Sequence, residues 1–205
     1  GFATGDYSGT LVIDPTLSWA TYYGDIGVEA IRNGCVSGDK YGNGYFGGNT
    51  GSAANIATTG SYMDTIAGTT DAFLVKFSSS GTRLWATYYG GVDYEYVYGI
   101  TCDTFGNAYL SGYTQSTAGI ATTGSFQTSL NGGTDAFLVK FDTGGVRQWA
   151  TYFGGSGTEQ CFGVTCDKAN NVYICGYTQS SSAIASSGAH QTTYGGANDA
   201  FIAKF

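Results

Sequence analysis

The sequence predicts an all-β chain built from three copies of one unit of about 64 residues. The heptad Asp-Ala-Phe-Leu-Val-Lys-Phe at residues 71–77 returns unchanged at 135–141 and nearly unchanged at 199–205. A second motif, Trp-Ala-Thr-Tyr, begins at Trp19, Trp85 and Trp149. Because both motifs recur at nearly the same spacing, the chain is an array of one supersecondary unit, and each residue can be compared with its counterparts in the other units.

The composition fits a globular β protein and excludes several other classes. Charged residues make up 11% and aromatic residues 16% of the chain, so there is enough apolar surface to form a core in one domain or two small ones. The chain has 34 glycines and one proline, which suits short twisted strands joined by tight turns. A net charge of −7 without a Lys/Arg cluster argues against nucleic acid as a partner. No apolar run approaches the length of a membrane span.

The first 18 residues lie outside the repeats. Residues 11–13, Leu-Val-Ile, predict a short strand that ends at Asp14-Pro15. The chain starts at Gly1 and shows no apolar signal-peptide region, so we expect a leader to be removed or to lie outside this sequence. The cysteine count is five, with no C-x-x-C pair, and it does not decide the redox compartment.

From Trp19 to Phe205 each unit divides into four predicted strands. In the third unit these are residues 147–153 with the Trp motif, then 162–167, 171–178 and, after a long polar segment, 199–205. Their lengths are typical of strands, and no segment has the apolar period of an amphipathic helix.

A short turn separates the second and third strands of each unit. It begins at Asp39, Asp103 or Asp167, and it ends in Gly-Asn or Asn-Asn. We expect a type I turn followed by a left-handed residue, because Asn170 replaces glycine there and Asn is the next-best residue for that conformation.

Four antiparallel strands per unit, joined by short links, indicate β-propeller blades rather than a sandwich. Strands of a blade lie between neighbouring blades, so both faces of the sheet are buried. The runs Phe-Leu-Val and Trp-Ala-Thr-Tyr-Tyr are apolar or aromatic on both faces, as this packing requires.

The repeat resembles the SBBP-type β-propeller repeat of secreted and surface bacterial proteins. The resemblance rests on Trp-Ala-Thr-Tyr-Tyr-Gly-Gly, on Asp-x-x-Gly-Asn-x-Tyr-x-x-Gly-Tyr-Thr at 103–114, and on the extended heptad at 132–141. It covers residues 19–205, and Leu-Val-Ile-Asp-Pro resembles the lead-in of such arrays. The variant at residues 119–125 is similar to versions from Bacteroidetes surface proteins. The resemblance implies a propeller exported from the cell and leaves its ligand open.

A closed propeller ring usually has about four to eight blades, and three repeats are fewer than that. Three interpretations stay open. The chain is part of a longer array, or two chains exchange terminal strands to form a six-bladed ring, or the three blades form an open arc with exposed sheet edges.

The glutamates share one place in the repeat. Glu29, Glu95 and Glu159 each lie ten residues after a Trp, in the link between blades. One interpretation is a metal site on the rim for a structural cation such as calcium, with Asp25 and Asp93 as further oxygen ligands. The other, favoured by recurrence in every unit, is that each glutamate caps backbone N–H groups or pairs with a Lys or Arg.

No motif predicts catalysis, so we expect no enzyme and no catalytic residue. The heptad aspartates Asp71, Asp135 and Asp199 recur as turn or rim groups, and no carboxylate pair breaks the repeat. The single histidine, His190, holds a position that is aromatic in the other units, and we expect it to pack or to face solvent.

Two further features concern the third unit and the loops. A disulfide between Cys161 and Cys175 is geometrically marginal, because the two are offset from direct register. The polar segments at about 50–70, 114–134 and 178–198 are candidates for recognition loops, with Gln115, Ser116 and Thr117 as a solvent-facing tip that binds ligand.

We therefore expect a non-enzymatic, extracellular or cell-surface module that binds or scaffolds, with an extracellular glycan or protein as partner. Two alternatives stay open: a structural spacer or assembly subunit joined through its terminal strands, and an enzyme with its site in the propeller channel. An enzyme would need residues that break the repeat. The features that do so are Cys161, His190 and a two-residue insertion near Glu29.

Overall fold

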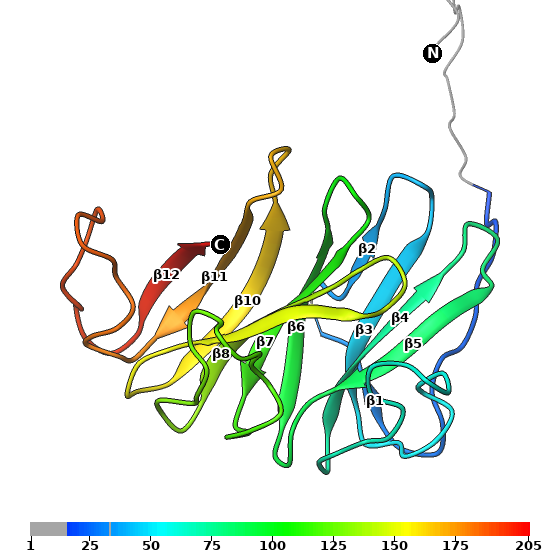
Figure 1. The fold of residues 1–205 in the computed structure, drawn as a ribbon, viewed down its shortest axis with the longest axis horizontal. Helices are drawn as coiled ribbons and strands as arrows, with labels where there is room; N and C mark the ends of the chain where they lie inside the picture. The colour runs from blue at the N-terminus through cyan, green and yellow to red at the C-terminus, as the bar shows by residue number, and fades with distance from the viewer. Residues whose placement is uncertain (1–15, 33) are drawn as a thin grey trace, which may run out of the picture.

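The computed structural model describes residues 16–32 and 34–205, so the predicted strand at 11–13 lies outside the described part. The described residues form twelve strands and no helix, which confirms the all-β prediction (Figure 1). It follows that no helix in this part of the chain could cross a membrane. The strands are β1 (Glu29–Ala30), β2 (Val36–Gly38), β3 (Gly44–Thr50), β4 (Asp71–Phe77), β5 (Arg83–Tyr89), β6 (Glu95–Cys102), β7 (Ala108–Thr114), β8 (Asp135–Phe141), β9 (Arg147–Phe153), β10 (Glu159–Cys166), β11 (Val172–Thr178) and β12 (Asp199–Lys204).

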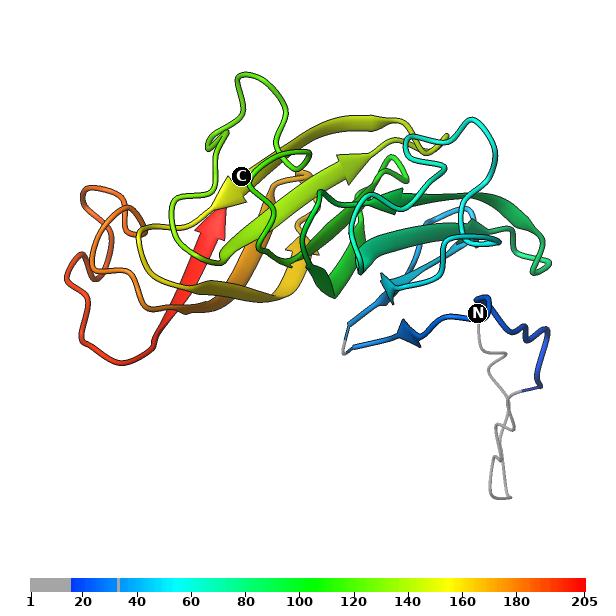
Figure 2. The same ribbon diagram turned by 90° about the horizontal axis from the view of Figure 1, so that it is seen from below.

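The strands form three antiparallel sheets, one for each repeat. Their orders are β1-β3-β4-β5 with β2 also paired to β3, then β6-β7-β8-β9, then β10-β11-β12. Figures 1 and 2 show the sheets side by side in a fan whose two ends do not meet. Successive antiparallel sheets packed in this way are β-propeller blades, and the third blade has three strands.

The Trp strand is the fourth strand of blades 1 and 2, where it pairs with the preceding Asp heptad, although it comes first when the sequence is divided into repeats at each Trp. In blade 1, β4 pairs with β5, so that Lys76 lies opposite Trp85. The turn between them is closed by the hydrogen bond from the Ser78 N–H to the Thr82 carbonyl. A tight hairpin is the shortest way to join two antiparallel strands, whereas the glycines after β5 lead the chain into the next sheet.

The predicted Asp turns are confirmed. Asp103 accepts hydrogen bonds from the N–H groups of Phe105 and Asn107, both at 2.9 Å. The residue in the left-handed conformation is glycine in blades 1 and 2, whereas Asn170 takes that place in blade 3 with φ of 64°. The turn is therefore stabilised by the side chain of its first residue in every blade.

Aromatic pairs join neighbouring blades. The first heptad Phe packs on the last ring of the preceding Trp motif, with ring centroids at 5.4 Å for Tyr23–Phe73, 5.3 Å for Tyr89–Phe137 and 5.0 Å for Phe153–Phe201. The next heptad residue faces the following blade and is fully buried at Leu74 and Leu138. Its counterpart Ile202 is 76% exposed, because no blade covers that face of β12 in the described part of the chain.

The Trp side chain constrains a glycine in the next blade. Gly145 has a φ of +86°, and a Cβ added to it would lie 2.8 Å from the Trp85 ring. Gly145→Ala is expected to lower the free energy of unfolding by about 2–4 kcal/mol, because it combines left-handed strain with displacement of the indole. Urea unfolding would measure this cost. Gly124→Ala is the matched control, since Gly124 has a φ of +78° but open space around its Cβ, so equal losses for the two variants would contradict the packing explanation.

Candidate functional site

The first strands of the blades converge on one side of the fan, and partly exposed aromatic residues gather there. β6 contacts β2 and β3 of blade 1 and β10 of blade 3. In a propeller this is the side that faces the central channel. The residues, called here the aromatic row, are Tyr94, Tyr96, Tyr98, Tyr113, Phe162 and Tyr177.

The rings of the aromatic row touch one another from blade 2 to blade 3. Within blade 2, Tyr113 lies between Tyr96 and Tyr98, with centroid distances of 5.0 and 5.7 Å. Tyr98 then meets Phe162 of blade 3 edge to face at 5.1 Å. Tyr94 and Tyr177 extend the row at its two ends, at 6.3 Å from Tyr96 and 5.7 Å from Phe162. Ring contacts of this kind fix the side chains before any ligand binds.

A β-bulge in β6 sets the direction of these tyrosines. The pairing of β6 with β7 shifts between Val97 and Gly99, so Tyr98 is the additional residue. Opposite the bulge, a Cβ on Gly112 would lie 1.8 Å from the Tyr96 carbonyl oxygen, so only glycine fits there. Buried Val97 alternates with partly exposed Tyr96 and Tyr98, and both rings therefore remain on the accessible side.

Arg32 of blade 1 completes the site. Its guanidinium carbon lies 5.1 Å from the ring centroid of Tyr96 and 5.3 Å from that of Tyr98. Arg32 belongs to the two-residue insertion that blade 1 carries between Glu29 and Asp39. Its side chain is exposed, and within residues 16–32 and 34–205 no carboxylate lies at salt-bridge distance from it. A stacked guanidinium keeps its N–H groups available to an anionic group.

The aromatic row is suited to binding. Burial, followed by the neighbouring Tyr98, raises the pKa of Tyr113, so its phenol stays neutral and can donate a hydrogen bond at physiological pH. Flat rings, hydroxyl groups and one guanidinium provide stacking, hydrogen bonding and charge pairing. The row and Arg32 contain no carboxylate, imidazole or thiol to act as acid, base or nucleophile.

The predicted glutamates lie at the blade links, where Glu95 and Glu159 are fully buried and Glu29 is half-buried. The Oε1 atom of Glu95 accepts a hydrogen bond from the Thr114 hydroxyl at 2.5 Å, and Oε2 accepts one from the Gly91 N–H at 3.0 Å. Glu159 repeats this with Thr178 and Gly155, at 2.5 and 2.8 Å. Glu29 is held by Thr50 at 2.8 Å, Ser52 at 2.5 Å and the Asp25 N–H at 3.3 Å.

These contacts match the capping interpretation of the glutamates. Burial raises the pKa of Glu95 to about 7, with the nearby Asp71 carboxyl as a further cause. Among the described residues, no three His, Cys, Asp or Glu side chains come together in a way that could hold a metal. Asp93, predicted as a further ligand, donates its backbone N–H to the Ser116 hydroxyl. The calcium hypothesis therefore stays a prediction to which the geometry adds nothing.

The three residues of the predicted loop tip differ in their exposure to solvent. Gln115 and Thr117 are exposed, whereas Ser116 is fully buried, so the expectation that it faces solvent is wrong. The reason is that the Ser116 carbonyl accepts a hydrogen bond from the Tyr152 hydroxyl at 2.8 Å, while its own hydroxyl accepts one from the Asp93 N–H at 2.9 Å. Ligand binding by the two exposed residues stays a prediction.

The remaining candidates fall outside the aromatic row. His190 was expected either to pack or to face solvent, and its side chain is exposed. Cys161 is buried and Cys175 is exposed, and the described residues contain no disulfide. The heptad carboxylates anchor the preceding loops, as where Asp71 accepts the N–H groups of Ala67 and Gly68 at 2.8 and 3.0 Å.

The sequence reasoning missed the aromatic row, although a signal was present. The counterparts of Tyr96 are Ala30 and Gln160, and the counterpart of Tyr113 in blade 1 is Asn49. These departures from the repeat, together with the insertion that holds Arg32, lie at the place where the aromatic row forms.

Comparisons with known proteins agree with the observed fold. A family model described as a β-propeller repeat, SBBP, matches residues 84–118 and 148–182. An uncharacterized WD repeat-containing protein of Acanthamoeba polyphaga mimivirus is 30% identical over 115 residues, which is 54% of this chain. The chain spans only 8% of the length of that relative.

Proposed function

Because this chain carries SBBP β-propeller repeats, we propose that it is a non-enzymatic binding module whose recognition surface is the aromatic row with Arg32. The observation that carries the proposal is the stack of Arg32 on Tyr96 and Tyr98. It brings residues of two blades together at positions where the repeat is not kept, whereas the residues that build the blades recur in all units.

An extracellular glycan is the ligand that this chemistry fits best. A sugar ring has a C–H face that stacks on an aromatic ring and hydroxyl edges that pair with phenol groups. Rings that are already packed against each other lose little conformational freedom on binding. Arg32 adds a preference for glycans with a carboxylate or sulfate group.

Display outside the cell is part of the same proposal. It is supported by the resemblance of the repeat to those of secreted and surface proteins. The long polar loops, including the exposed Gln115 and Thr117, provide additional surface around the rim.

Binding to a glycan array of neutral and acidic oligosaccharides tests the proposal. The variants Tyr96→Gln and Tyr113→Asn are expected to weaken binding at least about tenfold, the usual effect of removing an aromatic anchor. Both should fold, because Gln160 and Asn49 occupy the same places in the other blades. Arg32→Gln is expected to lose binding to acidic glycans selectively.

Phe105→Ala is the matched control. Phe105 is 63% exposed on an Asp turn, and Ala169 holds its place in blade 3. This variant should bind as the unchanged chain does. Failure of the unchanged chain to bind any glycan, or full binding by both tyrosine variants, would contradict the proposal.

A further inference from the structure

Residues 19–23 pack on blade 1 in the same way as β5, the fourth strand of blade 1, packs on blade 2. A Cβ on Gly81 would meet the Trp19 ring at 2.8 Å, just as one on Gly145 would meet the Trp85 ring. The Tyr23 hydroxyl donates to the Ile56 carbonyl at 2.5 Å, and the Tyr89 hydroxyl donates to the equivalent Ile120 carbonyl at 3.0 Å. The segment therefore occupies the place of the fourth strand of a preceding blade.

The sheet to which this strand would belong is not among the sheets that the described residues form. Residues 16–25 form no strand, although they carry the sequence that forms β5 and β9 in the other blades. Tyr22 is fully exposed at 102%, whereas its counterparts Tyr88 and Tyr152 are each 1% exposed. Those two donate their hydroxyls to the carbonyls of Ser52 and Ser116, at 2.7 and 2.8 Å.

Blade 3, in contrast, has a sheet but no fourth strand among the described residues. β4 and β8 pair with the Trp strands β5 and β9, but β12 pairs with β11 alone among the described strands. In blades 1 and 2 the long polar segment also holds the far edge of the Trp strand, as where the Thr122 N–H donates to the Ala150 carbonyl at 2.9 Å and the Tyr152 N–H to the Gln127 carbonyl at 3.1 Å. The corresponding segment 179–198 (orange in Figure 1) is joined to the start of β12 by the Gly195 N–H, which donates to Asp199 at 2.7 Å, and among the described residues it has no Trp strand to hold.

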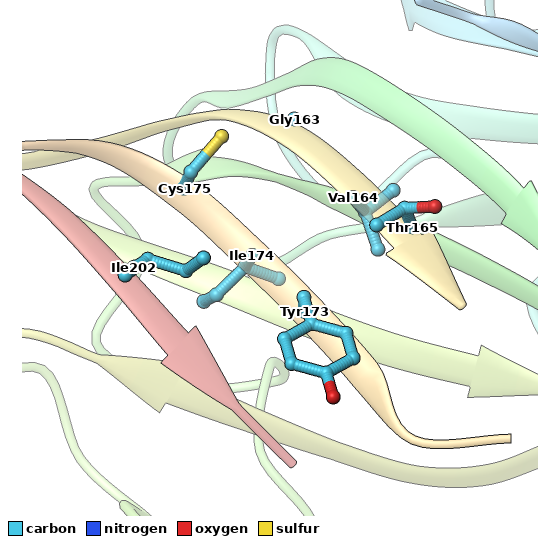
Figure 3. Close-up of a pocket in the computed structure, with 7 residues that line it drawn as sticks. All are labelled: Gly163, Val164, Thr165, Tyr173, Ile174, Cys175 and Ile202. Carbon is cyan, nitrogen blue, oxygen red and sulfur yellow. The ribbon is translucent and has the colours of Figure 1, made fainter. Parts of the chain in front are cut away.

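The outer face of blade 3 is also uncovered and apolar. Figure 3 shows a pocket at this face, where Cys175 and Ile202 are both exposed on the side that the next blade would cover. His190 is the counterpart of Phe126 in blade 2, and Phe126 stacks on Phe153 of the Trp strand at 6.2 Å. In blade 3 the described residues place no such strand next to His190. The apolar face, the edge of β12 and the loop thus all correspond to a strand and a blade that the described residues do not supply.

We propose that residues 19–23 of a second copy of this chain add to β12 as the fourth strand of blade 3. The pairing of β4 with β5 fixes the register, with Tyr22 of the second copy opposite Phe201 and Thr21 of the second copy opposite Ile202. The Tyr22 hydroxyl then donates to the Ser180 carbonyl, by analogy with the equivalent bonds in blades 1 and 2.

A second copy satisfies the geometry, whereas closure of the three described blades on themselves does not. Three blades are below the known range of about four to eight for a closed ring. Two reciprocal contacts between two copies make a six-bladed ring with no free sheet edge. Each contact repeats the junction between blades 1 and 2, because residues 19–23 are already seated on blade 1 of their own copy. The ring also encloses the aromatic rows of both copies in one channel.

Sedimentation of the 205-residue chain tests this proposal. At about 100 µM the chain is expected to sediment with the mass of two copies. Tyr22→Ala and Ile202→Asp are each expected to weaken the dimer at least about a hundredfold, because each acts at both junctions. Both residues are exposed in one chain, so the monomers of these variants should keep the unchanged circular dichroism spectrum. Val92→Asp, at a residue 68% exposed in a blade link, is the control that should leave the dimer intact.

Three results would overturn the proposal. The first is a monomer at this concentration, and the second is a dimer that neither variant weakens. The third is a ladder of larger species, which would mean that strands join chains end to end without closing a ring. Protection of the amides of residues 19–23 and 199–204 from hydrogen exchange, present in the dimer and lost in Tyr22→Ala, would support it independently.

Discussion

Phe137→Ala is expected to lower the free energy of unfolding by about 3–5 kcal/mol. Phe137 is fully buried, and its ring lies 5.3 Å from that of Tyr89 in the preceding blade. The substitution therefore removes a large apolar side chain and weakens the junction between blades 1 and 2. In an array of repeats the stability of each blade depends on its contact with the neighbouring blade, so the substitution destabilises both blades.

Urea unfolding of Phe137→Ala, followed by tryptophan fluorescence, measures this effect. The control is Phe105→Ala, which deletes the same atoms from a side chain that is 63% exposed. Its effect should stay within about 0.5 kcal/mol of zero. Similar losses for the two variants would show that the aromatic pairs between blades do not hold the fan together.

The stability of the folded chain is expected to fall as the pH rises from about 4.5 to about 7. Burial raises the pKa of Glu95 to about 7, so in this window the folded chain keeps a proton that the unfolded chain has released. The loss amounts to something on the order of 3 kcal/mol at neutral pH, because each unit of pKa corresponds to about 1.4 kcal/mol. Asp71 acts in the same direction, since burial raises its pKa as well.

Glu95→Gln is expected to remove most of this decline. The amide carries no charge to be buried, and the Thr114 hydroxyl can rotate to accept a hydrogen bond from it. Thermal unfolding of the unchanged chain and the variant at several pH values, from about 3 to about 8, gives the two slopes. The same decline in both proteins, or greater stability of the unchanged chain at pH 7 than at pH 5, would contradict the assignment.

Asp103→Asn is the matched comparison, because it should change how the stability of the chain depends on pH at acidic pH and not near neutrality. Burial disfavours the Asp103 carboxylate, but hydrogen bonds from Asn107 and Phe105 and the charge of Lys140 outweigh this and hold its pKa below the usual range. The stabilisation is present above the pKa of the unfolded chain and is lost as the pH falls through the folded pKa. The variant should flatten the acid limb and leave the decline toward neutral pH unchanged.

The strands and turns could be predicted from the sequence because each depends on residues close to one another along the chain. The heptad that forms β4 and β8, and the Asp turns with Asn170 in the left-handed position, follow from local propensity and from repetition. The capping interpretation of the glutamates has the same basis, since a group that recurs in every unit serves the unit.

The order of strands within a blade depends on which turn closes a hairpin. The chain alternates Trp strand and Asp heptad without a break, so the sequence permits a blade to begin at either one. The four-residue turn at 78–81 pairs β4 with β5, and this places the boundary after the Trp strand. That assignment leaves residues 19–23 and β12 as the two unjoined halves of one hairpin.

Repetition in the sequence was thus sufficient for the all-β class, the blade and its turns, because the unit folds mainly through contacts within itself and with its neighbours. The burial of Ser116 required the tertiary structure, since it depends on the Tyr152 hydroxyl 36 residues away. So did the aromatic row, which brings Arg32, Tyr98 and Phe162 together from three blades. Such contacts are decided by how sheets pack against one another, and no local pattern in the chain encodes that packing.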